Sequence, residues 1–217
     1  MKGRNSGQKL TLKQAGACSA EASPKAQAII DAATRLFIEY GFARVSVDRI
    51  AHTANVSKAT VYNNFEDKQH VFRVSMEILG QKVCPVTLGL PYNDDAQSVL
   101  EECAIWLQRT GTSPEFIGFY RLCITEARRF PEISQLGYTC MRDGLFVPCE
   151  DVLRTLGDRG LLEIPDTKMA AEHFCSAILG TRIWRQLLER PADVDIVSKK
   201  YISQVVDMFK RAYAVTP

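Results

Sequence analysis

The sequence predicts an all-α protein with a small N-terminal three-helix domain and a larger helical C-terminal domain. Apolar residues recur at helical spacing in one segment after another, and no stretch shows the alternation that is typical of a strand. No apolar run approaches the roughly 20 residues of a membrane span. A chain of 217 residues is long enough for one large domain or two small ones.

Breaks in the helical pattern divide the chain into three parts. Residues 1–23 are rich in Gly, Ser, Ala, Lys and Gln without a sustained period, so we expect a flexible basic tail there. Such a tail either enters a minor groove or stays solvated. Pro85 and Pro91 interrupt the pattern again. We therefore predict an N-terminal domain over residues 24–83 and a C-terminal domain over residues 94–217.

The N-terminal domain is organised around Ser46–Phe65, which predicts two short helices joined by a tight turn. Ser46 and Ser57 stand where a side-chain oxygen caps the first amides of each helix. Asn55 tolerates the left-handed conformation that a sharp helix exit needs. A preceding helix opens at Pro24 and ends at Gly41. This order is typical of a helix-turn-helix motif.

The second short helix has one apolar and one polar side. Val61 and Phe65 face the first helix. The other side carries short polar groups, a cation and a phenol, with no acid and no long aliphatic chain: Lys58, Ala59, Thr60, Tyr62, Asn63 and Asn64. Such a surface suits a phosphate-lined groove, where short side chains reach base edges and cations reach phosphates. The alternative is the solvated outer face of a small core helix.

The N-terminal segment resembles the DNA-binding domain of the tetracycline-repressor (TetR) family. The residues that carry the resemblance, by type and by spacing, are Gly41-Phe42, Ser46-Val47, Ile50-Ala51, the run NVSKATVYNNF and Lys68. The resemblance covers residues 24–80. It implies that Ser46 meets a phosphate, that Tyr62 and Asn63 contact phosphates or base edges, and that Lys68 binds a phosphate. It also places Lys58, Ala59 and Thr60 near base edges. With Ser57, these form the predicted DNA-binding set.

The charge distribution agrees with a nucleic-acid-binding N-terminal domain. Residues 1–73 hold 11 Lys and Arg against 6 Asp and Glu, a net charge of +5. Residues 74–217 hold 16 against 19, a net charge of −3. A basic front and a mildly acidic back fit a phosphate-binding domain on a neutral body, although chance asymmetry of this size is the alternative.

Caps and helix breakers predict the elements of the C-terminal domain. Ser113-Pro114 is a helix start with a cap and a proline at the first position, and Pro131 ends that helix and starts another. Pro148 must kink or interrupt the next one. We expect helices over about residues 95–109, 114–130, 131–156, 167–189 and 193–214.

The segment EARRFPEI, residues 126–133, resembles the C-terminal half of a TetR subgroup with AefR-like domains. This resemblance implies a pocket for a small, mostly apolar inducer and a two-fold dimer built from the last two helices. Candidate pocket residues are Trp106, Phe116, Phe119, Tyr120, Cys123, Tyr138, Met141, His173, Phe174 and Trp184. The alternative is that these side chains simply fill a core.

A homodimer also follows from the geometry of DNA reading, since one short helix reads too few bases. Paired domains about 34 Å apart read a palindrome in successive major grooves. The interface candidates on the last two helices are Ala177, Ile178, Thr181, Trp184, Arg185, Leu188, Tyr201, Val205, Met208 and Phe209.

Signals of catalysis and metal binding are missing from the sequence. It contains no GxSxG, HExxH or GxxxxGK[ST], the three histidines are far apart, and no carboxylates pair. The seven cysteines are widely spaced without a CxxC, so most are expected to be core residues, with a redox-sensing pair as the alternative. We therefore expect no enzyme, no cofactor and no metal.

The sequence thus predicts a cytoplasmic, DNA-binding transcriptional regulator, and in the first place a repressor that a small apolar ligand releases from a palindromic operator. Activation is the open alternative for its mode of action. The alternative function is a small-molecule binding protein without operator binding, but such a protein would have an eroded recognition helix. Lys58, Thr60, Tyr62 and Lys68 are all present. No membrane partner is expected.

Overall fold

The computed structural model describes residues 23–84, 95–188 and 198–215, and every regular element within them is a helix. The predicted all-α class is confirmed. Contacts divide the chain into two compact units between Gln81 and Lys82, which we call the head and the body. No helix in the described ranges has the length and apolar character needed to cross a membrane. Most of the predicted tail, residues 1–22, lies outside these ranges.

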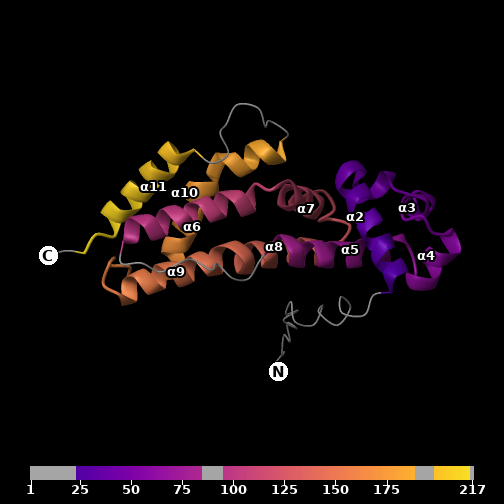
Figure 1. The fold of residues 1–217 in the computed structure, drawn as a ribbon, viewed down its shortest axis with the longest axis horizontal. Helices are drawn as coiled ribbons and strands as arrows, with labels where there is room; N and C mark the ends of the chain where they lie inside the picture. The colour runs from indigo at the N-terminus through magenta and orange to yellow at the C-terminus, as the bar shows by residue number, and fades with distance from the viewer. Residues whose placement is uncertain (1–22, 85–94, 189–197, 216–217) are drawn as a thin grey trace, which may run out of the picture. The chain divides into compact units, whose positions relative to one another are not determined.

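The head contains α2 (Pro24–Arg44), α3 (Val47–Thr53), α4 (Lys58–Asn64) and most of α5 (Lys68–Val83), coloured from indigo to magenta in Figure 1. Ser23 caps α2, because its Oγ accepts a hydrogen bond from the Ala26 amide at 3.2 Å. Gly41 interrupts α2 with φ +73°, as predicted for the end of this helix. A left-handed conformation of this kind favours glycine because it has no Cβ.

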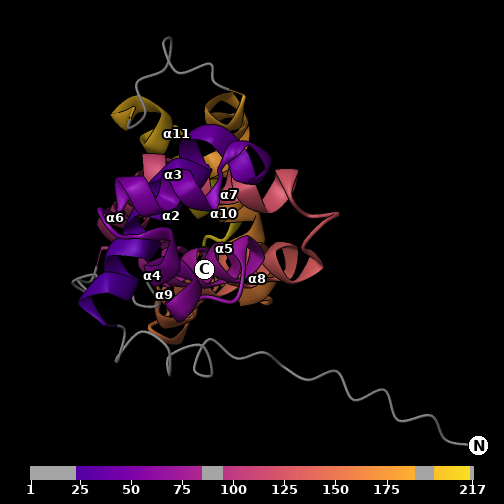
Figure 2. The same ribbon diagram turned by 90° about the vertical axis from the view of Figure 1, so that its right-hand side faces the viewer.

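Three phenylalanine rings form the centre of the head. The ring of Phe72 on α5 lies edge-on to Phe37 and Phe42, with centroids 5.1 and 5.0 Å away. Edge-to-face aromatic contacts add to the free energy gained from burying the rings. The helices α3 and α4 pack against each other and against α2, as Figure 2 shows. The aromatic cluster thus holds α5 to the segment that leads into the helix-turn-helix.

The body is built around α10 (Thr167–Leu187). This helix packs against α6 (Ala96–Gly111), α7 (Pro114–Thr125), α9 (Val147–Asp158) and α11 (Lys199–Ala212). The remaining elements are α8 (Pro131–Met141) and a π-helical segment, η1 (Arg142–Phe146). The predicted starts at Ser113-Pro114 and Pro131 are both present. Residues 193–197 of the predicted last helix lie outside the described ranges, and α11 begins after its cap Ser198.

Pro148 interrupts the helix through a change of helix type. A proline has no amide hydrogen, and its ring clashes with the carbonyl four residues earlier, which here belongs to Gly144. The π-helical segment lies directly before the proline, where its wider turns relax this conflict. The interruption predicted at Pro148 is therefore found one turn earlier, and α9 follows without a gap.

The prediction of one continuous helix over residues 167–189 is wrong at Gly180. The backbone there has φ +29° and ψ −127°, so α10 consists of two helical pieces. A glycine inside a helical pattern costs only about 1 kcal/mol, and so it does not by itself predict a break. No proline marks this position, which is why the break is not visible in the apolar spacing.

Two glycines about two turns apart allow cysteine-bearing segments to approach α8 and η1 closely. A Cβ placed on Gly144 would lie 2.6 Å from the Cβ and 3.0 Å from the Cα of Cys84. A Cβ placed on Gly137 would lie 2.9 Å from the Sγ of Cys123. Six cysteines lie in the described ranges, all buried with free thiols. Their predicted role as core residues is confirmed.

We predict that Gly144→Ala destabilises the body by about 1–3 kcal/mol, because the new methyl group overlaps the backbone of Cys84. Urea unfolding followed by circular dichroism would measure the loss. Gly157→Ala is the matched control, since the nearest atom to its new Cβ is 4.0 Å away and alanine is the better helix former. Equal stability of the two variants would contradict the prediction.

Candidate nucleic-acid interface

Two serine caps and one asparagine set the course of the helix-turn-helix. The Oγ of Ser46 accepts a hydrogen bond from the Arg49 amide at 3.2 Å, and the Oγ of Ser57 accepts one from the Thr60 amide at 3.0 Å. Asn55 between them has φ +53°, the left-handed conformation expected for it. The turn that these residues define agrees with the prediction from the sequence.

The helix α4 buries one side only. Val61 and Phe65 are 1% and 6% exposed, and they anchor α4 against the rest of the head. Tyr62 is 49% exposed on the other side. Lys58, Ala59 and Asn63 are exposed as well, and Thr60 is half-buried. The polar side of α4 is therefore available to a partner.

Two polar side chains on α4 are held by local hydrogen bonds. The Oγ1 of Thr60 lies 2.8 Å from the Oγ of Ser57, and the two share a hydrogen bond. The side-chain amide of Asn64 donates to the Thr60 carbonyl at 2.8 Å. Because these bonds restrict the rotamers of Thr60 and Asn64, the two side chains keep a defined orientation at the surface of the helix.

Lys58 forms an ion pair that crosses from α4 to α3. Its Nζ lies 3.0 Å from Oδ2 of Asp48, and both side chains are largely exposed. The hydrogen bond that Lys58 donates to Asp48 and the negative charge of this carboxylate raise the pKa of Lys58. Lys58 therefore carries its positive charge throughout the physiological pH range.

Lys68 lies at the start of α5 and binds two backbone carbonyl groups where the chain passes from α2 to α3. Its Nζ donates to the Phe42 carbonyl at 2.9 Å and to the Val45 carbonyl at 2.8 Å. The ammonium also lies 4.1 Å from the centre of the Phe42 ring, a cation–π distance. Lys68 thereby ties α5 to the chain that enters α3, a structural role that the sequence reading did not include.

Arg49 and Asp48 extend the surface of the helix-turn-helix beyond the predicted set. The guanidinium carbon of Arg49 lies 3.7 Å from the centre of the Tyr40 ring, and both Asp48 and Arg49 are exposed. Both face away from the buried Ile50 and Ala51 of the same helix. Their place outside the apolar stripe of α3 is the signal that could have identified them.

The predicted pocket residues of the body fall into three groups. Four are buried: Phe116, Phe119, Cys123 and Phe174. Three are half-buried: Trp106, Tyr120 and Met141. Three are exposed: Tyr138, His173 and Trp184. The exposed three lie on outward faces of α8 and α10, and the role of all ten residues in ligand binding stays a prediction.

Tyr120 connects several residues of this set. Its ring stacks on Phe116 with centroids 4.8 Å apart, and its hydroxyl donates to the Gly137 carbonyl at 2.9 Å. Burial raises the pKa of the Tyr120 hydroxyl and raises that of the Cys123 thiol to about 12. Both groups are therefore neutral at physiological pH, so this part of the body is apolar and uncharged.

Gln108 is a buried polar residue that the sequence reading missed. It lies on α6 with 0% exposure, and neither its amide nitrogen nor its amide oxygen has a hydrogen-bond partner among the residues that the structure describes. An unsatisfied amide in a protein interior costs roughly 1–3 kcal/mol. Its position within the apolar stripe of Leu100, Ala104 and Gly111 is the signal that could have revealed it.

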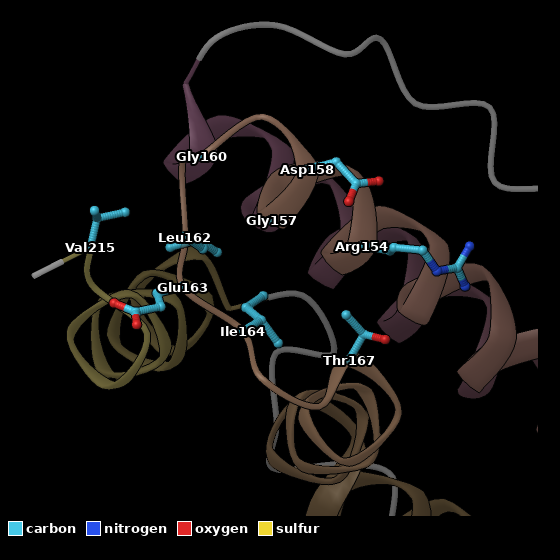
Figure 3. Close-up of a pocket in the computed structure, with 9 residues that line it drawn as sticks. All are labelled: Arg154, Gly157, Asp158, Gly160, Leu162, Glu163, Ile164, Thr167 and Val215. Carbon is cyan, nitrogen blue, oxygen red and sulfur yellow. The ribbon is translucent and has the colours of Figure 1, made fainter.

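A hollow of about 430 Å³ lies at the C-terminal end of α9, shown in Figure 3. It is lined by Arg154, Gly157, Asp158, Gly160, Leu162, Glu163, Ile164, Thr167 and Val215. None of the ten predicted pocket residues borders it. Three of its lining residues carry formal charges, so it differs from the apolar pocket that the sequence led us to expect.

The last two helices expose several large apolar side chains. Trp184 and Leu188 at the end of α10 are 61% and 71% exposed, and Met208 on α11 is 53% exposed. Val205 and Phe209, which were interface candidates, are buried within the body. The exposed three are therefore the apolar members of that candidate set that remain open to a partner.

Comparison with known families identifies the chain. The model of bacterial regulatory proteins of the tetR family matches residues 29–74. The model of the AefR-like transcriptional repressor C-terminal domain matches residues 98–215. The chain belongs to the TetR family. Both resemblances drawn from the sequence are thus confirmed, and this TetR-family protein is a DNA-binding transcriptional regulator with an AefR-like C-terminal domain.

Individual relatives agree with this assignment. The uncharacterized HTH-type transcriptional regulator YvkB of Bacillus subtilis (strain 168) is 26% identical over 167 residues, which are 75% of this chain and 83% of YvkB. A crystal structure of a TetR-family regulator from Mesorhizobium loti MAFF303099 superposes with a TM-score of 0.77 at 25% identity, covering 90% of this chain and all of that one.

A third similar protein carries a more specific name. The flavonoid-responsive regulator FrrA superposes with a TM-score of 0.66 at 26% identity, covering 88% of this chain and 98% of FrrA. Members of the TetR family bind operator DNA and dimerise, and these relatives are transcriptional regulators rather than enzymes.

We predict that Lys68→Met destabilises the head by about 1.5–3 kcal/mol, because it removes two charged hydrogen bonds to backbone carbonyls. Thermal unfolding of the full chain would show the loss. Lys58→Met is the matched control: its ammonium is exposed and paired only across the surface, so the unfolding midpoint should barely move. A Lys68→Met protein as stable as the control would refute the structural role.

Proposed function

We propose that this TetR-family protein is a dimeric repressor that binds a palindromic operator and leaves it when a small, largely apolar ligand binds in the body. The observation that carries the proposal is the one-sided burial of α4. Val61 and Phe65 anchor the helix, and its exposed side offers a cation, hydroxyls and amides without an acid. That chemistry suits a major groove lined by phosphates.

The proposed contacts on DNA follow from this geometry. Lys58, Ala59 and Thr60 approach base edges, whereas Ser46, Ser57, Tyr62, Asn63 and Lys68 approach the sugar-phosphate backbone. The rotamer restriction of Thr60 by Ser57 supports its role in sequence discrimination, because a fixed hydroxyl selects its partner. Lys68 also braces the turn before α3, so its loss affects both stability and binding.

The proposed dimer is built from α10 and α11. Trp184, Leu188 and Met208 present apolar side chains that a second copy would cover. Large exposed apolar side chains that gather at one face mark interaction sites more often than isolated ones do. Two heads in one assembly read two half-sites, which explains the preference for a palindrome.

The proposed ligand is a neutral aromatic molecule with a hydrogen-bonding group. Phe116, Phe119 and Tyr120 supply an aromatic wall, and the Gln108 amide, which has no partner among the described residues, supplies N–H donors and an acceptor oxygen in the same body. The name of FrrA, a flavonoid-responsive regulator, is in keeping with a ligand of this class. Such a ligand releases DNA only if it binds the released state more tightly than the operator-bound state.

Operator binding is tested by selecting duplexes from a randomised library and then measuring affinity over a range of salt. We expect a steep salt dependence from phosphate contacts. Tyr62→Phe should weaken binding to all selected duplexes by about tenfold, through loss of a hydroxyl contact to phosphate. Thr60→Ala should instead change relative affinities among duplexes. Tyr138→Phe, another exposed tyrosine, is the control. A protein that binds no duplex at low salt would refute the proposal.

We predict that Gln108→Leu stabilises the ligand-free protein by about 1–3 kcal/mol, because it removes an unsatisfied buried amide. It should also abolish the thermal shift produced by apigenin, a flavonoid probe with a hydroxyl beside a carbonyl. Gln97→Leu on the same helix is the control, since that amide already bonds Glu101 at 2.7 Å. A lower melting temperature for Gln108→Leu would contradict the predicted stabilisation, and an apigenin shift equal to that of wild type would exclude the amide as a ligand contact.

A further inference from the structure

The structure brings one acid to the polar side of α4, which has no acid of its own. Asp48 belongs to the first turn of α3, ten residues before Lys58 in the sequence. Its Oδ2 accepts a hydrogen bond from the Lys58 ammonium at 3.0 Å, and the two side chains are 68% and 52% exposed. The head therefore presents a donor and an acceptor side by side on its DNA-facing surface.

Stability does not explain this pair. Exposed ion pairs contribute little to folding, because water screens the charges and two long side chains must be ordered. For general DNA affinity the acid is unfavourable, since a carboxylate repels the phosphates of any duplex. Asp48 also lies in the first turn of α3, where the helix dipole favours an acid, but that effect needs no partner on α4. A gain that depends on the base sequence would account for its pairing with Lys58.

The edges of base pairs in the major groove offer the complementary pattern. A G·C pair presents the guanine N7 and O6 acceptors next to the cytosine N4 donor. The O6 and N4 atoms are joined by a Watson–Crick hydrogen bond, so they lie about 2.9 Å apart. That spacing matches the 3.0 Å between Lys58 Nζ and Asp48 Oδ2.

We propose that Asp48 and Lys58 act together to read one G·C base pair in each half of the operator. The Lys58 ammonium donates to guanine O6 and N7, and the Asp48 carboxylate accepts from cytosine N4. The inference rests on the proposed entry of α4 into the major groove. Asp48 is thus a specificity-determining residue, one that the polar side of α4 alone does not reveal.

An A·T pair satisfies this donor–acceptor pair less well. Its groove edge places the adenine N6 donor between two acceptors and adds the thymine methyl group. On an A·T pair the Lys58 ammonium reaches only one acceptor, either adenine N7 or thymine O4, and it lies next to the adenine N6 donor. On a G·C pair it reaches two adjacent acceptors, guanine N7 and O6. The pair accordingly favours G·C over A·T at the position that it contacts.

The experiment compares the full-length wild-type protein with Asp48→Ala, Lys58→Met and the double variant. Each is used to select duplexes from a library with 20 randomised base pairs, a length of about two helical turns. Affinities are then measured for the wild-type site and for the same site with the G·C pair replaced by A·T. We expect wild type to discriminate by about fivefold or more.

Each single variant should lose most of this discrimination, and the double variant should lose little more, because the two residues act as one unit. Asp151→Asn is the matched control. It breaks an exposed ion pair with Arg154, 2.8 Å long, in the body. This control should keep the wild-type base preference, and circular dichroism should show that all variants are folded.

Three results would overturn the inference. Asp48→Ala could tighten binding to every duplex equally with an unchanged preference, which would make the acid a mere electrostatic shield. The selected sites could contain no G·C position whose preference depends on Lys58. Wild-type protein could enrich no sequence at all, which would refute the proposed function itself and this inference with it.

Discussion

The shortness of α4 is the constraint on which the reading surface depends. A helix of seven residues is not stable alone, since nucleation costs more than so few hydrogen bonds return. Burial of Val61 and Phe65 on one side of the helix and the cap from Ser57 at its N-terminal end compensate for the cost of nucleation. The residues that anchor α4 in the head cannot contact DNA. The remaining exposed side chains must therefore be short and polar, with a fixed orientation.

Lysine has two physically different uses in this head. Lys68 is held by backbone carbonyls and by an aromatic ring, and so it connects helices. Lys58 is exposed and paired with a single carboxylate, so its position is defined without a large contribution to stability. A lysine side chain therefore stabilises the fold where backbone carbonyls surround it, and it stays available to a partner where it is exposed to water.

The body combines very close packing at two glycines with a buried polar group that lacks hydrogen-bond partners among the described residues. Gly137 and Gly144 exist where a side chain would collide with neighbouring cysteine-bearing segments. Gln108, by contrast, is fully buried, and within residues 23–84, 95–188 and 198–215 neither of its amide atoms has a hydrogen-bond partner. Interiors are close-packed and polar groups in them are normally bonded, so this exception is the reason for which we propose Gln108 as a ligand contact.

The sequence alone determined most helix starts and their caps, because these depend on neighbours in the chain. Ser46, Ser57, Ser113 and Pro131 each act within one turn, and the conformation of Asn55 is a local property of its side chain. The polar side of α4 followed from the same periodicity. The residue types and their spacing in the N-terminal segment and in residues 126–133 also sufficed to identify the family.

Only the tertiary structure decided which residues meet across elements. The pairing of Asp48 with Lys58, the carbonyls on Lys68 and the isolation of Gln108 join positions that no local period relates. The exposure of Tyr138 and Trp184 also depends on which helix faces are covered, and aromatic content cannot tell a core face from an open one. The local pattern shows which faces of a helix are apolar, and long-range packing decides which of them are buried.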